Sequence, residues 1–132
     1  MDDKQIKILV TDDEVDFKEL LSFWLKSRGY EVITASNGRE ALERIRSQAP
    51  DIVFLDLNMP EMDGLEVLKE LRSFNKELPV LIISAFVDDK RAKLARDYGI
   101  SGVFYKGKDF QEGLLLLESA LRTHKKLKKP QE

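Results

Sequence analysis

Cysteine is absent from this chain of 132 residues, and histidine occurs once, at His124. The absence of cysteine excludes disulfide bonds, thiolate catalysis and cysteine-based metal sites. Long apolar stretches are missing too: none approaches the roughly 18 residues that a membrane helix needs, and the acidic N-terminus does not resemble a secretion signal. The expected location is therefore cytoplasmic, with no contact to a membrane.

A strong excess of either charge is also absent. The net charge is −2, so nothing in the overall balance indicates direct binding to nucleic acid or to an anionic membrane. The length is that of one ordinary domain, which can bury a full core without metal or disulfide support. We expect a single domain over residues 1–124, followed at 125–132 by a basic C-terminal tail or the start of a linker.

Short apolar runs alternate with helical patterns along the chain. Strands are expected at residues 6–10, 30–35, 51–55, 79–84 and 102–105. The runs at 51–55 and 79–84 are apolar almost throughout, which indicates strands buried on both faces, as in a parallel sheet. The strict alternation predicts an α/β fold: a five-stranded, doubly wound parallel sheet of flavodoxin-like type, in the strand order 2-1-3-4-5.

Helix signals lie between these strands. The first helix is expected at residues 15–28, with a stop at Gly29 and one apolar face. The members of that face are Val15, Leu20, Leu21, Trp24 and Leu25. Three later helices are expected to begin with a capping-box pattern, in which Asn or Asp is followed three residues on by Glu. These pairs are Asn37 and Glu40, Asp63 and Glu66, and Asp109 and Glu112. A further helix is expected from about Asp88 to Gly99, and the last helix is expected to end near Lys126.

Polar side chains stand at the carboxyl ends of four of the five predicted strands. The first strand is followed by Asp12, Asp13 and Glu14, the third by Asp56, the fourth by Ser84 and the fifth by Lys106. In a doubly wound sheet, ligands bind beyond these strand ends, at the point where the strand order reverses. We therefore expect these side chains to meet in one acidic crevice.

The residue types in this crevice suit the transfer of a phosphoryl group. Clustered carboxylates repel one another, and a hard divalent cation such as Mg²⁺ is the simplest way to offset that repulsion. A carboxylate can attack phosphorus to form an aspartyl phosphate. Lys106 supplies a cation that could hold the transferred group, and Ser84 supplies a hydrogen-bond donor.

Several segments resemble the receiver domains of two-component response regulators. They are IKILVTDDE, DIVFLDLNMPEMDGLEVLKELR, LIISA and the lysine that ends the fifth strand, and the resemblance extends from residue 5 to about residue 123. It implies a signalling switch that takes a phosphoryl group from a histidine kinase or a phosphotransfer protein and catalyses only its own phosphorylation and dephosphorylation. The change would alter a face that binds an effector domain or a downstream protein.

The resemblance also implies a role for each site residue. Asp56 is expected to be the phosphoacceptor, Asp13 a direct ligand of Mg²⁺ and Asp12 a ligand acting mostly through water. Asp56 itself and the backbone carbonyl of Asn58 complete the expected metal ligands. Ser84 takes the position of the switch hydroxyl, and Lys106 that of the cation beside the phosphoryl group.

Three positions carry separate expectations. The family usually has Tyr or Phe where Val103 stands, so signalling through an aromatic side chain on the last strand is not expected. The family usually has proline, after a cis bond, where Gly107 stands. A trans Lys106–Gly107 bond is expected, because a cis bond before a residue other than proline costs about 3–4 kcal/mol. Phe86 borders the phosphoryl group in the family, and its ring is expected to slow self-dephosphorylation by hindering water.

Three other functions fit parts of the pattern. A haloacid dehalogenase-type enzyme also uses a nucleophilic Asp and Mg²⁺, but it needs a second Asp as general acid where this chain has Asn58. Flavin binding of the flavodoxin type needs a Ser/Thr-rich phosphate loop, and the loop at residues 12–14 is acidic instead. A pseudo-receiver, which is an interaction module that is never phosphorylated, usually lacks an acidic residue or the lysine. Both are present here, so the pseudo-receiver is the alternative that an experiment must exclude.

Overall fold

Strands and helices alternate strictly in the computed structural model, which describes residues 5–124. The strands are β1 (Lys7–Thr11), β2 (Glu31–Ala35), β3 (Ile52–Asp56), β4 (Val80–Ser84) and β5 (Gly102–Tyr105). The helices are α1 (Val15–Ser27), α2 (Gly38–Gln48), α3 (Gly64–Phe74), α4 (Lys90–Arg96) and α5 (Phe110–Thr123). Within the described residues, none of these helices has the length and apolar character needed to cross a membrane.

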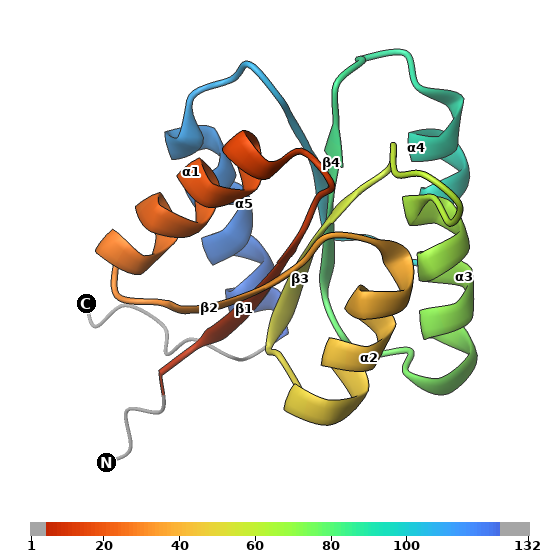
Figure 1. Ribbon diagram of the computed structural model, residues 1–132, viewed down its shortest axis with the longest axis horizontal. Helices are drawn as coiled ribbons and strands as arrows, with labels where there is room; N and C mark the ends of the chain where they lie inside the picture. Colours follow the sequence, from red (N-terminus) through yellow and green to blue (C-terminus); the bar gives the residue numbers. More distant parts are fainter. Residues whose placement is uncertain (1–4, 125–132) are drawn as a thin grey trace.

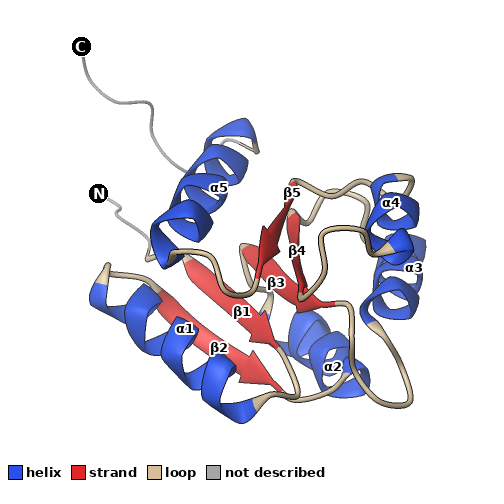
Figure 2. Ribbon diagram, turned by 90° about the horizontal axis from the view of Figure 1, so that it is seen from above, coloured by secondary structure: helices blue, strands red, loops and turns tan. Residues whose placement is uncertain are grey.

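The strands form one parallel sheet in the order β2-β1-β3-β4-β5 (Figures 1 and 2). β1 pairs with β2 on one side and with β3 on the other, so Val10 lies opposite both Thr34 and Phe54. β3 and β4 are buried along their whole length, because helices cover both faces of the sheet. The doubly wound α/β fold and the strand order predicted from the sequence are therefore confirmed.

The helices divide unequally between the two faces of the sheet. α1 and α5 lie on one face, and α2, α3 and α4 lie on the other (Figure 1). The core beneath α1 and α5 contains a group of aromatic rings whose neighbouring centroids are 6.0 to 6.5 Å apart: Phe17, Phe54, Phe104 and Phe110. The core beneath α2, α3 and α4 is mainly aliphatic. Because the helices of both layers pack against the sheet, the positions of the strand ends are fixed.

The predicted helix caps are present, although only one forms a complete capping box. Asp63 accepts a hydrogen bond from the backbone of Glu66, whose side chain accepts one from the backbone of Asp63. Asn37 caps α2 through Glu40 N, but the Glu40 carboxylate turns to Ser36 N instead. Asp109 caps α5 through the backbone N–H of Gln111. The predicted end near Lys126 and the tail at 125–132 lie outside the described residues.

The apolar face predicted for α1 is only partly correct. Three of its five members pack against the core: Leu21, Trp24 and Leu25. The other two, Val15 and Leu20, are 55% and 60% exposed. Lys18 and Ser22 take inner positions instead, because residues 18, 21, 22 and 25 recur at the spacing of a single helix face. Lys18 is tolerated there because its ammonium donates a hydrogen bond to Ser36 Oγ.

The peptide bond between Lys106 and Gly107 is trans, as expected, and residues 5–124 contain no cis bond. Gly107 has a φ of +90°, a left-handed conformation that glycine adopts freely and other residues adopt only with strain. Glycine at this position therefore lets the chain turn directly after Lys106 towards the Asp109 cap of α5.

Candidate functional site

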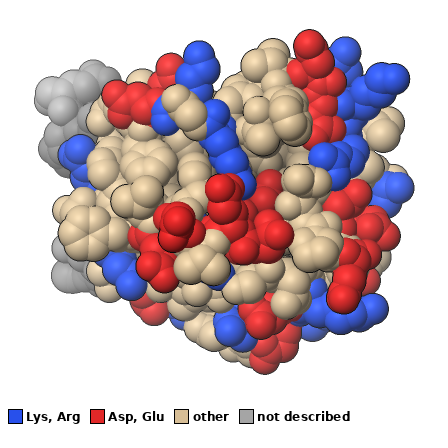
Figure 3. Space-filling view, turned by 45° about the horizontal axis from the view of Figure 1, so that its top comes forward, with Lys and Arg blue, Asp and Glu red and all other residues tan. Residues whose placement is uncertain are grey.

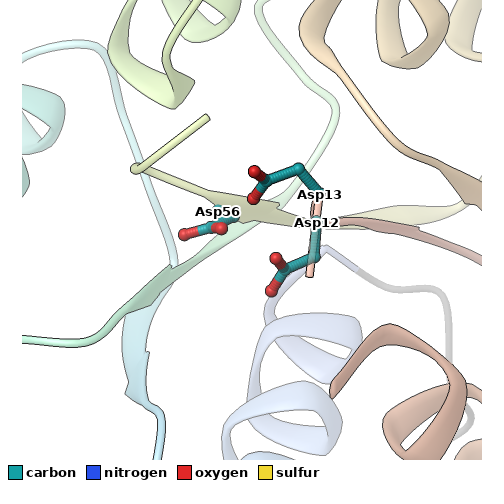
Figure 4. A group of neighbouring side chains, drawn as sticks. All are labelled: Asp12, Asp13 and Asp56. Atoms are coloured by element: carbon teal, nitrogen blue, oxygen red, sulfur yellow. The ribbon is translucent and has the colours of Figure 1, made fainter. Parts of the chain in front are cut away.

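Four strands bring their functional groups to one edge of the sheet. Asp12 directly follows β1 and Lys106 directly follows β5, while Asp56 and Ser84 are the last residues of β3 and β4. Asp12, Asp13 and Asp56 lie close together there (Figure 4). The convergence follows from the topology, because parallel strands all end on the same side and β1 and β3 are neighbours.

Short backbone hydrogen bonds fix the two buried carboxylates. Asp56 Oδ1 accepts from Asn58 N at 3.1 Å, and Asp12 Oδ1 accepts from Glu14 N at 2.9 Å. In both cases an Asp side chain closes a turn over its own backbone two residues on. Each carboxylate therefore has one oxygen engaged by the backbone, while the other, Oδ2, faces the Lys106 ammonium.

Gly64 lies directly behind Asp56. A Cβ at this position would overlap the backbone oxygen of Asp56 and would come within 2.9 Å of Leu57 Cα. Only glycine allows α3 to begin this close to the end of β3, and its own N–H donates to Leu57 O at 3.1 Å. The glycine of the M-D-G run thus sets the position of the strand end that carries Asp56.

The acidic group has the properties of a site for a hard divalent cation. Carboxylate oxygens of Asp12, Asp13 and Asp56 lie within 4.8 Å of one another. Asp12 and Asp56 are buried, and their Oδ2 atoms accept no hydrogen bond. Buried carboxylate oxygens without donors are costly unless a cation faces them. Acidic side chains also gather at the centre of this face of the molecule (Figure 3). The donor set therefore fits Mg²⁺, which prefers oxygen ligands.

Lys106 faces the same oxygens. Its Nζ lies 2.9 Å from Asp12 Oδ2 and 3.5 Å from Asp56 Oδ2, and it donates a hydrogen bond to Glu14 at 2.7 Å. Partial burial alone would lower the pKa of Lys106, but the hydrogen bond to Glu14 and the negative charges of Asp12 and Asp56 raise it above its ordinary value. The ammonium is therefore a permanent positive charge at the centre of the site.

Asp56 is poised between its charged and neutral forms. Burial, together with the neighbouring Asp12, raises its pKa to about 7, while the hydrogen bond from Asn58 and the charge of Lys106 act in the opposite direction. The carboxylate that ends the central strand thus lacks sufficient positive charge around it. A further cation would favour its ionised, nucleophilic form.

Ser84 is buried beside Asp56 on the neighbouring strand, but its hydroxyl points elsewhere. Ser84 Oγ donates to Phe86 O at 2.8 Å and accepts from Phe86 N at 3.2 Å. The hydroxyl therefore closes the turn that leaves β4. It would have to exchange these bonds to contact a group on Asp56.

The other expected positions fall as follows. The Asn58 side chain is exposed, and only its backbone is tied to the site, through Asp56. Val103 is half-buried against the cluster beneath α4. The adjacent residue, Phe104, is the buried aromatic residue of β5, and its ring faces α1 and α5 on the opposite side of the sheet. The position that is usually aromatic in the family is therefore occupied by the aliphatic side chain of Val103.

Arg91, in the first turn of α4, is a residue at the site that sequence reasoning missed. Its guanidinium donates to Leu57 O and is paired with Asp89. The only sequence signal is an arginine two residues after a helix-capping aspartate. That signal does not reveal the bond to a carbonyl 34 residues away.

Comparison with known proteins agrees with this geometry. Residues 8–118 match the family model of the response regulator receiver domain. The transcriptional regulatory protein ZraR of Klebsiella oxytoca is 40% identical over 121 residues, which cover 92% of this chain and 27% of that protein. The alkaline phosphatase synthesis transcriptional regulatory protein PhoP of Bacillus subtilis is 46% identical over 79 residues, covering 60% of this chain and 33% of PhoP.

A solved structure gives the same match in three dimensions. The receiver domain of NtrX from Brucella abortus superposes with a TM-score of 0.83 at 36% identity, covering 88% of this chain and 98% of that domain. The chain thus spans a whole domain of this type, but only 27% and 33% of the curated relatives ZraR and PhoP.

Proposed function

This chain belongs to the response regulator receiver domain family of two-component systems, and we propose that its Asp56 accepts a phosphoryl group in a Mg²⁺-dependent reaction. The observation that carries the proposal is the Asp56 Oδ2 atom. It is buried, accepts no hydrogen bond and lies 3.5 Å from the Lys106 ammonium, beside two further carboxylates. A carboxylate oxygen left free in such a place is available as a nucleophile.

In the proposed reaction, Asp56 Oδ2 attacks the phosphorus of a phosphodonor. A new P–O bond forms on Asp56, the bond from phosphorus to the donor breaks, and the donor leaves with that electron pair. Asp56 must be ionised to attack, and its pKa of about 7 leaves much of it protonated near neutral pH. Positive charge in the crevice therefore favours the reaction before any donor binds.

Asp12, Asp13 and Asp56 would hold Mg²⁺, with the backbone carbonyl of Asn58 as a further ligand by analogy with the family. When bound, the ion would offset the charge of the carboxylates and of the incoming phosphoryl oxygens. Lys106 would then turn from Asp12 towards the transferred group, which its long side chain allows. Ser84 would exchange its bond to Phe86 O for one to a phosphoryl oxygen, and this exchange would release the turn after β4.

The proposal extends to partners and limits. The donor would be a histidine kinase or a phosphotransfer protein, and the receiver would catalyse only its own phosphorylation and dephosphorylation. Residues 1–124 would form the switch, with 125–132 a tail or the start of a linker to an effector domain, or with a separate downstream protein as the target. Such donors obtain their phosphoryl group from ATP, so the cytoplasm is the proposed location.

The test is to incubate the protein with acetyl phosphate and Mg²⁺ and then determine its mass. We expect one added phosphate in the wild type, and none in D56N or in the presence of a chelator. An unchanged wild-type mass with acetyl phosphate and with a kinase would favour the pseudo-receiver alternative. Equal and stable labelling of D56N would show that a different residue is the acceptor.

A further inference from the structure

Arg91 joins two segments that the chain order keeps far apart. Its Nη1 donates to Leu57 O at 3.0 Å, in the loop between β3 and α3, and lies 3.7 Å from Asp63 Oδ2 at the start of α3. The rest of the guanidinium pairs with Asp89, the N-cap of its own helix, through Nε at 3.1 Å and Nη2 at 2.9 Å. The fork is therefore held on one side by α4 and aimed, on the other, at the loop that follows Asp56.

The carbonyl that Arg91 contacts belongs to a peptide group that also touches the phosphoacceptor. Leu57 C=O and Asn58 N–H are the two ends of one planar amide. The oxygen accepts from Arg91 and from Gly64 N, while the N–H donates to Asp56 Oδ1. Fixing the oxygen therefore fixes the direction of the N–H, because the amide turns as a unit.

The charge of the guanidinium strengthens this relay. Hydrogen bonds from a charged donor are stronger than neutral ones, and a peptide group polarised at its oxygen becomes a better donor at its N–H. The Arg91 and Asp89 side chains are shielded, at 31% and 10% exposure, so solvent screens the bond to Leu57 only in part. Within residues 5–124, the one backbone hydrogen bond to the Asp56 carboxylate thus comes from an amide that Arg91 orients.

We propose that Arg91 is a positioning residue for phosphorylation, acting through the Leu57–Asn58 peptide group to hold the Asp56 carboxylate with Oδ2 directed into the crevice. The inference rests on the proposed function of Asp56. It adds a residue on α4 to the machinery of a site whose other members lie at strand ends or within two residues after them. It also makes the first turn of α4 part of the site, because any movement of α4 that withdraws Arg91 loosens Asp56.

Arg72 provides a matched control. It lies on α3 and donates to the carbonyls of Tyr98 and Gly99, which follow α4, so it anchors the opposite end of that helix. Like Arg91 it is a partly shielded arginine bonded to backbone oxygens of another segment, but none of its hydrogen bonds reaches residues 56–63. R72A therefore frees the C-terminal end of α4 while it leaves the bond from Arg91 to Leu57 O in place.

The experiment compares R91A, R91K, R91Q and R72A with the wild type. The readouts are the amide NMR shifts of metal-free protein, the affinity for Mg²⁺ by calorimetry, and the rate of labelling by acetyl phosphate at saturating Mg²⁺. R91A should move the Asn58 amide signal and slow labelling about tenfold, the loss expected for one charge-assisted hydrogen bond. R91K, which keeps the charge but lacks the fork of the guanidinium, should recover part of the rate, and R91Q less.

R72A should lower the melting temperature but leave the Asn58 signal and the labelling rate within twofold of the wild type. The inference is overturned if R91A labels at the wild-type rate, or if R72A slows labelling as much as R91A does. If R91A does not fold, R91K and R91Q decide: wild-type rates and an unmoved Asn58 signal in both would overturn it. Failure of the proposed function itself would instead show as labelling of D56N, or as no labelling of the wild type.

Discussion

Two neighbouring regions of the site are held in place by different interactions. One is the acidic floor, formed by Asp12, Asp13 and Asp56. The other is the segment between β4 and α4, residues 85–89. The floor is held by the sheet: Asp12 N donates to Ala35 O, and Leu57 N donates to Ile83 O. The segment is exposed at Phe86 and Val87 and is tied down by the Ser84 hydroxyl at one end and the Asp89–Arg91 pair at the other.

This difference separates the residues of the proposed reaction from the segment that is proposed to move in response to it. Asp56 cannot shift without disturbing the fully buried strand β3, so the proposed nucleophile keeps its geometry. The segment can shift when a few polar bonds are exchanged, and Ser84 is one of the groups that would exchange them. A switch needs both properties, and here they lie on adjacent strand ends.

The largest expected effect arises from the excess negative charge of the floor. The folded-state pKa of Asp56, about 7, lies above its usual value of 3.8, so the native state holds the proton more tightly than the unfolded chain does. That stability is fully present below about pH 4 and is lost as the pH rises through 7. Without Mg²⁺, D56N should therefore be more stable than the wild type at pH 8, by on the order of 2–4 kcal/mol.

Urea denaturation at pH 5 and pH 8, with and without Mg²⁺, measures this effect. Mg²⁺ should stabilise the wild type at pH 8 far more than it stabilises D56N, because the variant lacks one of the three carboxylates. If the two proteins show the same dependence of stability on pH without Mg²⁺, the floor does not carry the excess negative charge described above.

The next effect is steric and also acts on the floor. In G64A, the new Cβ would overlap the backbone of Asp56, so the strand end or α3 must shift. Overpacking of this kind costs about 1–3 kcal/mol, and labelling by acetyl phosphate should fall at least as steeply as stability. G113A is the control, because the three atoms nearest to a Cβ there belong to the ring of Phe104, at 3.2 to 3.4 Å, and not to the backbone of the floor. Normal labelling by G64A would mean that the floor is not rigid.

The same division explains which features could be predicted from the sequence. Asp12, Asp56, Ser84 and Lys106 were predictable because parallel strands deliver their ends to one edge, so chain position alone fixes the neighbourhood. The exposed Leu20 was not, because an amphipathic pattern on α1 does not reveal how the helix is rotated against the sheet.

Two further features depend on contacts that local pattern does not encode. The Arg91 bond to Leu57 O joins residues 34 apart in the chain, and its geometry depends on how α4 packs beside α3. The turn of the Ser84 hydroxyl towards Phe86 depends on the backbone path after β4, in a segment without a repeating pattern. The floor is thus predictable from topology, whereas the segment that responds is not.

A smaller effect is expected from the segment. The Phe86 ring is 66% exposed, and Phe86 bonds to Ser84 through its backbone alone, so F86A should leave both those bonds and the stability nearly unchanged. Without the ring, water should reach the phosphoryl group more easily, and phosphate loss should accelerate about two- to fivefold. V87A, the exposed neighbour, is the control. Equal half-lives for F86A and the wild type would exclude the ring as a shield.

The smallest expected effect is a pattern of NMR chemical-shift changes. This pattern tests which residues respond to phosphorylation. Val103 has few side-chain rotamers, because it is β-branched, and it is half-buried against the cluster that includes Ala92 and Ala95 of α4. A large swing of the side chain at this position of β5 is therefore not available, and we expect the response to pass through the backbone from Ser84 to Arg91 and through α4 as a body.

Binding of a phosphoryl mimic to the Mg²⁺-loaded protein should accordingly shift amide signals across residues 84–105, with the strongest changes near Ser84 and Arg91. V103A should preserve that pattern, since the side chain supplies packing rather than a rotamer switch, whereas R91A should weaken it. α2 packs on β1, β2 and α3, away from this route, and should change little. Shifts confined to α2, with residues 84–105 unmoved, would place the response on the other side of the molecule and remove the contrast between floor and segment.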